Sequence, residues 1–189
     1  MKYFKKLIGK KCYLSPLNLE DAKQYTKWIN DLEVTKYLLL ICQQITLEKE
    51  QEILADMSKK GVQIFGIIDL KSDKLIGNCS LFKINHLNRK ADFGIFIGDK
   101  KFWNKGYGTE ATKLILDYGF NILNLNNIML EVFSFNKRAI KSYEKIGFNT
   151  IGKRRESRII GGKKYDEIYM DILASEFESI YIQKVMEEV

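Results

Sequence analysis

The sequence has few of the residues from which many protein sites are built. It contains one histidine, His86, and three cysteines that lie far apart, Cys12, Cys42 and Cys79. An odd number of cysteines without a paired spacing predicts neither a disulfide framework nor a zinc site. His86 lies in a polar stretch between two strand-like runs, so we interpret it as a turn residue. A histidine-based triad or metal cluster then lacks its main component, and we expect no metal.

Long apolar runs are also missing. The longest, residues 37–42, is far too short to cross a bilayer, and the first nine residues lack the apolar length of a signal peptide. We therefore expect a cytoplasmic protein without a membrane partner. With 189 residues, 46% apolar, the chain can form one domain with a sizeable core. We expect one domain over 1–189, with its core in 9–173 and an additional helix in 174–189.

One stretch, residues 91–122, predicts a strand, a loop and a helix in succession. A β-branched and aromatic run at 91–97 precedes a basic loop, and apolar residues then recur every three or four positions. These residues are Ala111, Leu114, Ile115, Tyr118 and Ile122. The first turn of a helix offers unpaired N–H groups and partial positive charge. Gly106 and Gly108 would admit a bulky anion, and Lys100, Lys101 and Lys105 would attract it, so we expect a pyrophosphate here.

Three kinds of phosphate-binding loop use this physics, and the spacing of residues distinguishes them. The nucleotide-hydrolase loop fails, because Gly108 is followed by Thr-Glu where Lys and Ser or Thr are needed. The dinucleotide fingerprint is matched by Gly106, Gly108 and Ala111, and Glu131 ends the next strand, where a ribose-binding carboxylate belongs. The pattern alone leaves that alternative open. However, residues 98–105 separate these glycines from the strand, and the fingerprint normally opens its domain.

The third kind fits best. The stretch resembles the acetyl-CoA-binding motif of the GNAT superfamily of N-acetyltransferases, with Trp103 where arginine or glutamine is usual. Residues 136–148 resemble the second cofactor motif of that family. Residues 13–17 and 28–34 resemble the N-terminal signature of its branch of ribosomal-protein N-terminal acetyltransferases, the RimJ/RimL-like branch. Together these motifs span residues 9–173.

The other elements agree with that resemblance. We expect further strands at 12–17, 63–69, 75–84, 128–133, 150–160 and 165–173, and helices at 18–28, 46–60 and 137–146. Capping boxes are expected at Asn18 with Asp21 and at Ser175 with Glu178, and Ile29 and Leu32 extend the buried stripe of the first helix. Asn136 is expected to cap the helix at 137–146, and Gly147 to end it. The resemblance implies an α/β (α+β) GNAT fold. Its single mixed, mostly antiparallel sheet has splayed fourth and fifth strands and helices on both faces.

The resemblance also implies site residues and roles. Acetyl-CoA as co-substrate would contact Ile95, Phe96, Ile97, Trp103, Asn104, Lys105, Gly106, Tyr107, Gly108, Thr109, Asn136, Ala139 and Ser142. Lys137, Arg138 and Lys141 could reach its 3′-phosphate. Tyr143 would protonate the leaving thiolate, and Asp92 or Glu131 would take the proton of the amine. A backbone N–H near Phe96 or Ile97 would meet the oxyanion.

The acceptor is not specified beyond a primary amine of a peptide or protein N-terminus or of a small molecule. A formal net charge of +7 suits both a ligand with several phosphates and an acidic or nucleic-acid partner. The basic region 153–164 is expected beside the acceptor groove, where it would disfavour polycations and make spermidine a poor substrate. The alternative is an acyl-CoA-binding or nucleic-acid-associated module with the same fold and no turnover. A homodimer is compatible with the sequence.

Overall fold

The computed structural model describes residues 2–38, 41, 43–59, 62–179 and 181–187, so Cys42 and Lys60 lie outside the described residues. The strands are β1 (Leu7–Ile8), β2 (Cys12–Pro16), β3 (Gln63–Asp69), β4 (Leu75–Asn85), β5 (Lys90–Ile97), β6 (Asn127–Phe133), β7 (Asn149–Ile160) and β8 (Lys163–Leu173). The α-helices are α1 (Ala22–Ile29), α2 (Leu32–Thr35), α3 (Leu47–Lys59), α4 (Tyr107–Asn121), α5 (Lys137–Ile146) and α6 (Ile182–Met186). Short 3-10 turns are η1 (Leu19–Asp21), η2 (Lys100–Phe102) and η3 (Ala174–Glu176).

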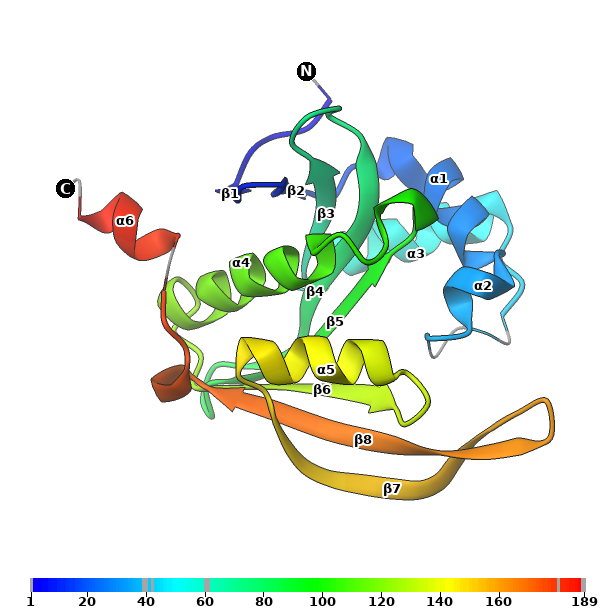
Figure 1. Ribbon diagram of the computed structural model, residues 1–189. Helices are drawn as coiled ribbons and strands as arrows, with labels where there is room; N and C mark the ends of the chain where they lie inside the picture. Colours follow the sequence, from blue (N-terminus) through cyan, green and yellow to red (C-terminus); the bar gives the residue numbers. More distant parts are fainter. Residues whose placement is uncertain (1, 39–40, 42, 60–61, 180, 188–189) are drawn as a thin grey trace.

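The described strands form one mixed sheet in the order β1-β2-β3-β4-β5-β6-β8-β7 (Figure 1). Every neighbouring pair is antiparallel except β5 and β6, which run parallel. Pairing between these two strands covers Lys90–Asp92 against residues 127–129, and β5 beyond Asp92 leaves its β6-facing edge open. The expected GNAT fold and the splayed pair of central strands are therefore confirmed.

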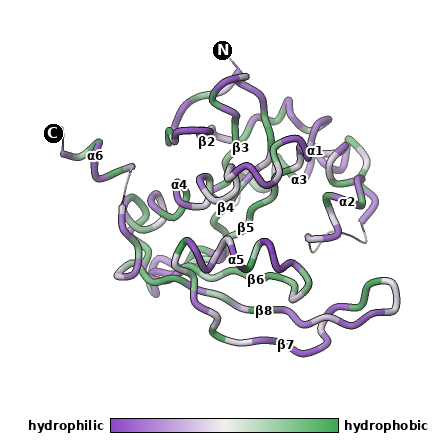
Figure 2. The backbone as a smooth tube through the Cα atoms, viewed as in Figure 1, coloured by the Kyte–Doolittle hydropathy of each residue, from purple (hydrophilic) through white to green (hydrophobic). Residues whose placement is uncertain are grey.

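Helices cover both faces of the sheet because neighbouring residues of a strand point to opposite faces. On β2, Leu14 packs into the core beneath α4 and α5, whereas Tyr13 packs into a second core beside α1 and α3. Ile67 and Ile68 divide in the same way on β3. Figure 2 shows the strand β6 as mostly hydrophobic and β7, at the outer edge of the sheet, as largely hydrophilic.

The helix caps agree in part with the predictions. Asn18 accepts from the Glu20 N–H at 3.0 Å, but Asp21 does not complete a capping box. It is buried instead, with its carboxylate bound to the Lys2 ammonium at 2.5 Å and to the Tyr3 hydroxyl at 3.1 Å. The side chain of Asn136 caps α5 as predicted, by accepting from the Ala139 N–H at 3.3 Å.

Three predicted helix features are wrong. Leu32 is 68% exposed, because Asp31 caps a separate short helix, α2, and so breaks the continuation of α1. Ile122 lies beyond the last residue of α4 and is half exposed. No helix starts at Ser175 in the described part of the C-terminus, because Glu176 folds back onto the Leu173 N–H at 2.9 Å in a single 3-10 turn, and α6 begins only at Ile182.

Asp117 fixes the C-terminal segment to the centre of α4. Its side chain is fully buried and accepts hydrogen bonds from the Ser179 hydroxyl and from the Tyr181 and Ile182 N–H groups, at 2.7, 2.9 and 3.0 Å. A buried carboxylate is tolerated where several donors meet it. The segment after β8 is therefore held to α4 by Asp117, together with apolar packing of Phe177, Tyr181 and Ile182 against the core.

Candidate active site

A cleft of about 840 Å³ lies along the open edge of β5. Its walls are β5, β6, the start of α4 and α5 on one side, and α1, α3 and residues of β3 and β4 on the other. Most of the predicted site residues line it, including Tyr143, Asp92, Asn136, Ala139 and the residues 95–97. Lys105 and Tyr107 do not contribute to the lining.

The first turn of α4 is left open toward this cleft. Gly106 precedes the helix with φ of 84°, a left-handed conformation that glycine adopts at little cost. No side chain caps the helix, and within the described residues the N–H groups of Tyr107, Gly108 and Thr109 have no partner. The Thr109 hydroxyl lies 2.8 Å from that of Ser142, which joins α4 to α5. Three free donors at a helix start are the groups that an anion needs, and the pyrophosphate site itself stays a prediction.

Residues that the sequence did not single out hold this turn in place. The Glu110 carboxylate accepts from the N–H groups of Lys10, Lys11 and Cys12 at 2.9, 2.7 and 2.9 Å. The Lys11 ammonium donates to the Lys105 carbonyl at 2.6 Å. The loop is therefore fixed to the β1–β2 hairpin before any ligand arrives. A glutamate in the first turn of a helix was the only sequence signal for this role.

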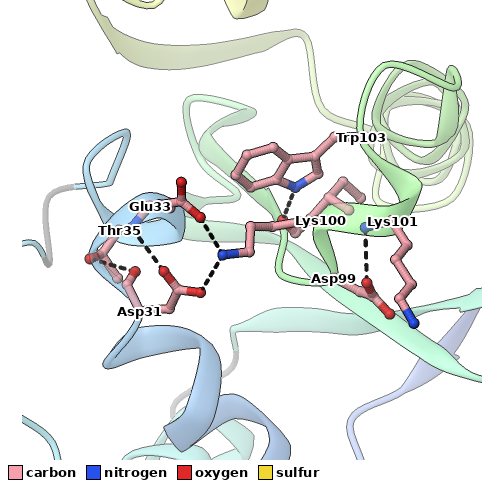
Figure 3. Close-up of polar contacts among 8 residues, drawn as sticks. Asp31, Glu33, Thr35, Asp99, Lys100, Lys101 and Trp103 are labelled. Carbon is pink, nitrogen blue, oxygen red and sulfur yellow. Dashed lines mark hydrogen bonds and ion pairs between the residues drawn. The ribbon is translucent and has the colours of Figure 1, made fainter.

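The other end of the loop is attached by Tyr107 and Lys100. The Tyr107 hydroxyl donates to the buried Asp69 at 2.7 Å, which explains why Tyr107 points away from the cleft. Figure 3 shows the Lys100 ammonium between Asp31, which caps α2, and Glu33 of α2. It lies 2.9 Å from the Asp31 carboxylate and also pairs with Glu33. Lys100 was predicted to attract a phosphate, and it serves instead as a link between η2 and α2.

Trp103, the residue that departs from the family pattern, has a defined contact. Its indole N–H donates to the Ile97 carbonyl at 2.7 Å and so ties the loop to the end of β5 (Figure 3). The Arg138 guanidinium lies over the indole ring at 5.2 Å and donates to the Asn104 side chain at 3.2 Å. Arg138 thus holds the loop from α5, with a cation–π contact as part of that contribution.

The open edge of β5 presents particular backbone groups. In an antiparallel pair, residues alternate between bonding to the partner strand and turning their polar groups away. The Gly98 N–H donates to the Ile76 carbonyl at 2.8 Å, so the alternation turns the groups of Phe96 toward β4 and those of Ile95 and Ile97 outward. Trp103 already uses the Ile97 carbonyl. Ile95 is then the residue with both polar groups available, and the Ile97 N–H is the better oxyanion donor of the predicted two.

Tyr143 faces the cleft from α5. Its ring packs edge-on against Phe93 and Phe148, with centroids 6.4 and 5.7 Å apart, and its hydroxyl has no partner in the described part of the chain. Burial raises the pKa of Tyr143 to about 12, and the nearby positive charge of Arg138 opposes that shift. The phenol is therefore protonated at neutral pH and has a proton to give.

The two candidate bases differ in their surroundings. The Asp92 carboxylate forms an ion pair with the Lys83 ammonium at 2.7 Å, and this contact raises the pKa of Lys83. Glu131 also lines the cleft, is exposed, and has no hydrogen bond or ion pair within the described residues. Proton uptake by Asp92 would require it to leave Lys83, whereas Glu131 needs no such rearrangement.

The basic region 153–164 does not line this cleft. Lys153 pairs with Asp166 at 3.4 Å and Lys164 with Glu156 at 2.7 Å, on the outer hairpin of β7 and β8. The region borders a separate depression, formed by Lys153, Arg155, Glu156 and Asp166. Arg158 of this region nevertheless lies over the ring of Phe133, which lines the cleft, at 5.2 Å. The effect of these charges on polycationic acceptors therefore stays a prediction.

Comparisons with known proteins agree with this geometry. The acetyltransferase (GNAT) domain family matches residues 11–149. The chain is 30% identical to an uncharacterized N-acetyltransferase, p20, of Bacillus licheniformis, over 90% of this chain and 97% of that protein. It is 30% identical to the spermidine N(1)-acetyltransferase of Escherichia coli K12 over 87% of each, and 29% identical to the putative ribosomal N-acetyltransferase YdaF of Bacillus subtilis, over 86% and 91%.

Among solved structures, a similar one is the spermidine N-acetyltransferase of Vibrio cholerae in complex with CoA and spermine. Its TM-score is 0.80 at 28% identity, and the match covers 89% of this chain and 98% of that chain.

No helix within the described ranges has the length and apolar character needed to cross a bilayer. The sequence motifs, the splayed sheet and the match over residues 11–149 together place this chain in the GNAT family of N-acetyltransferases, enzymes for which acetyl-CoA is the donor.

Proposed function

We propose that the protein acetylates a primary amine by direct attack of the amine nitrogen on the thioester of acetyl-CoA. One observation carries this proposal: the uncapped first turn of α4, the open edge of β5 and the Tyr143 hydroxyl all border one cleft. Phosphate binding, thioester positioning and thiolate protonation need these three kinds of group.

The residues of the cleft fit acetyl-CoA physically. The N–H groups of Tyr107, Gly108 and Thr109 can hold phosphate oxygens, since Gly108 leaves the helix start uncovered. A Cβ at Gly108 would stand 3.9 Å from Ile97, in the space between the helix start and the strand edge. The outward polar groups of Ile95 can pair with an amide-bearing chain. Acetyl-CoA, when bound, supplies the activated thioester.

This chain then supplies donors and acceptors for the proton transfers. As the C–N bond forms and the C–S bond breaks, the Ile97 N–H meets the carbonyl oxygen and Tyr143 gives its proton to sulfur. The amine must also lose a proton, because amines with pKa values of about 8 to 10.4 are mostly charged at neutral pH. We assign that step to Glu131, directly or through water, and keep Asp92 as the second candidate. The second proton that the nitrogen loses after attack restores the Tyr143 hydroxyl through water.

The acceptor class is a further part of the proposal. Similarity to a putative ribosomal N-acetyltransferase supports the RimJ/RimL-like branch and a peptide N-terminus, whereas similarity to spermidine acetyltransferases supports a small amine. No residue of region 153–164 lines the cleft, so nothing there blocks a small amine directly, and the poor use of spermidine stays a prediction. The expected homodimer and the cytoplasmic location stay predictions.

Thiol release from acetyl-CoA in the presence of an amine panel tests the proposal. The panel should hold peptides with free N-termini, alkyl monoamines, alkyl diamines and spermidine. Release that depends on an amine, with a matching acetylated product by mass spectrometry, is expected. Tight acetyl-CoA binding without release for any amine would contradict the proposal and favour a binding module without turnover.

A further inference from the structure

The side of the cleft formed by α1 and α3 contains a carboxyl group that the proposed chemistry does not use. Glu50 is 2% exposed, yet it lines the cleft, and its Oε2 atom has no hydrogen-bond partner in the described residues. Buried polar atoms are normally paired, so each exception calls for an explanation. An apolar residue would fill this position at lower cost if packing were its only role.

Most of the cleft residues on the same elements as Glu50 are apolar. The apolar cleft residues contributed by α1, by α3 with its preceding segment, and by β3 are Ile29, Ile45, Ile53, Leu54, Met57 and Ile64. Burial alone raises the pKa of Glu50 to about 7, with no contribution from a neighbouring charge. Glu50 also lies in the first turn of α3, which Thr46 caps by accepting from the Lys49 N–H at 3.2 Å, and a helix start favours negative charge.

The cations that line the cleft are placed elsewhere. Lys83 is paired with Asp92, and Arg138, Lys141 and Lys145 belong to α5, on the opposite wall. An ionised carboxylate in apolar surroundings is favourable only when a cation or several donors meet it. The residues that the structure describes supply neither to Glu50, and a cationic ligand in the cleft would supply one.

Glu50 is separated from the position where acetyl transfer is proposed. The helix α3 packs against α1 and β3, and β3 is two strands from β5 in the sheet. Because neighbouring strands lie about 4.8 Å apart, the distance from the open edge of β5 to Glu50 is on the order of 10 Å. The group that meets Glu50 is therefore a different one from the reacting nitrogen.

We propose that Glu50 selects the acceptor by pairing with a second protonated amine, held about 10 Å from the reacting nitrogen by a hydrocarbon chain that fills the apolar wall. This inference rests on the proposed acetyl transfer to an amine and adds the acceptor's chemical class, an alkyl diamine. Glu50 is then a specificity-determining residue, while Tyr143 and Glu131 act at the reacting atoms.

Octamethylenediamine and octylamine test this directly, since they share a chain length and differ only in the second amine. For the unmodified protein we expect a KM at least tenfold lower for the diamine. The variant Glu50→Gln should lose that preference, with a raised KM for the diamine and a KM for octylamine that is unchanged or lower. Glu52→Gln is the matched control, because Glu52 is exposed on the same helix and pairs with Lys49. It should keep the preference.

Binding measured without turnover separates this inference from the proposed function. Calorimetric titration of the CoA complex with the diamine should show binding to the unmodified protein and at least tenfold weaker binding to Glu50→Gln. If that difference is seen but no amine is acetylated, only the proposed function fails. An equal loss of turnover for both amines in Glu50→Gln, or a diamine preference that survives the substitution, would overturn the role assigned to Glu50.

Discussion

Glu50 predicts a pH dependence of the free energy of unfolding. Burial raises the pKa of its carboxyl from an ordinary 4.5 to about 7, so the folded protein holds this proton more tightly than the unfolded chain. The stability linked to Glu50 is fully present below pH 4.5 and is lost as pH rises through about 7. At about 1.4 kcal/mol per pKa unit, the loss amounts to about 3 kcal/mol.

The variant Glu50→Gln removes this titration while keeping nearly the same side-chain volume. Other groups titrate over the same range, so the measured quantity is the difference between the two proteins in the free energy of unfolding, from urea titrations at pH 5, 6, 7 and 8. That difference should move in favour of the variant by about 2 to 3 kcal/mol between pH 5 and pH 8. Glu52→Gln should show no such movement. A difference between Glu50→Gln and the unmodified protein that is constant across this range would refute the reasoning.

Three further substitutions test the site and its support. Tyr143→Phe should lower kcat by about 100-fold and leave acetyl-CoA affinity within a few-fold. The control Tyr118→Phe, which removes a hydroxyl bonded to Gln63, should leave kcat unchanged. Full turnover in Tyr143→Phe would return Tyr143 to a packing role. Gly108→Val should abolish the rise in melting temperature caused by acetyl-CoA, and Gly152→Val, in open space on β7, should retain it. Asp117→Ala should reduce the free energy of unfolding by about 2 kcal/mol, because three donors of the C-terminal segment lose their acceptor. Proteolysis after η3 should become faster, and an unchanged digestion pattern would contradict that role.

The predictions that held were those with a local cause. Gly106 at the start of α4 with φ of 84°, the Asn136 cap of α5, and Gly147, which ends α5 with φ of 117°, follow from backbone chemistry within a few residues. The capping box at Ser175 failed because Glu176 accepts from the Leu173 N–H, so that the turn starts two residues earlier and consists of η3 alone. Local patterns fix such turns only when no tertiary contact competes.

The features that could not be predicted depend on residues far apart in the chain. The basic loop indicated a phosphate-attracting Lys100, but its partners Asp31 and Glu33 lie 69 and 67 positions earlier, on α2. The isolation of Glu50 likewise has no local signal, because α3 is buried against α1 and β3 by tertiary packing. The first turn of α3 contains Glu48 and Glu50, and the spacing of residues does not indicate which of the two becomes buried.

The short parallel ladder between β5 and β6 has a mechanical consequence. Three residue pairs, at Lys90–Asp92, carry the lateral connection between the five strands before the split and the three after it. A ligand that pairs with Ile95 on one side and contacts α5 on the other would add a second connection between these two halves of the sheet. Amide hydrogen exchange along β5 and β6 should then slow together when the ligand is bound. The two halves of the sheet would open as one cooperative unit, because the ligand would occupy the gap between these strands.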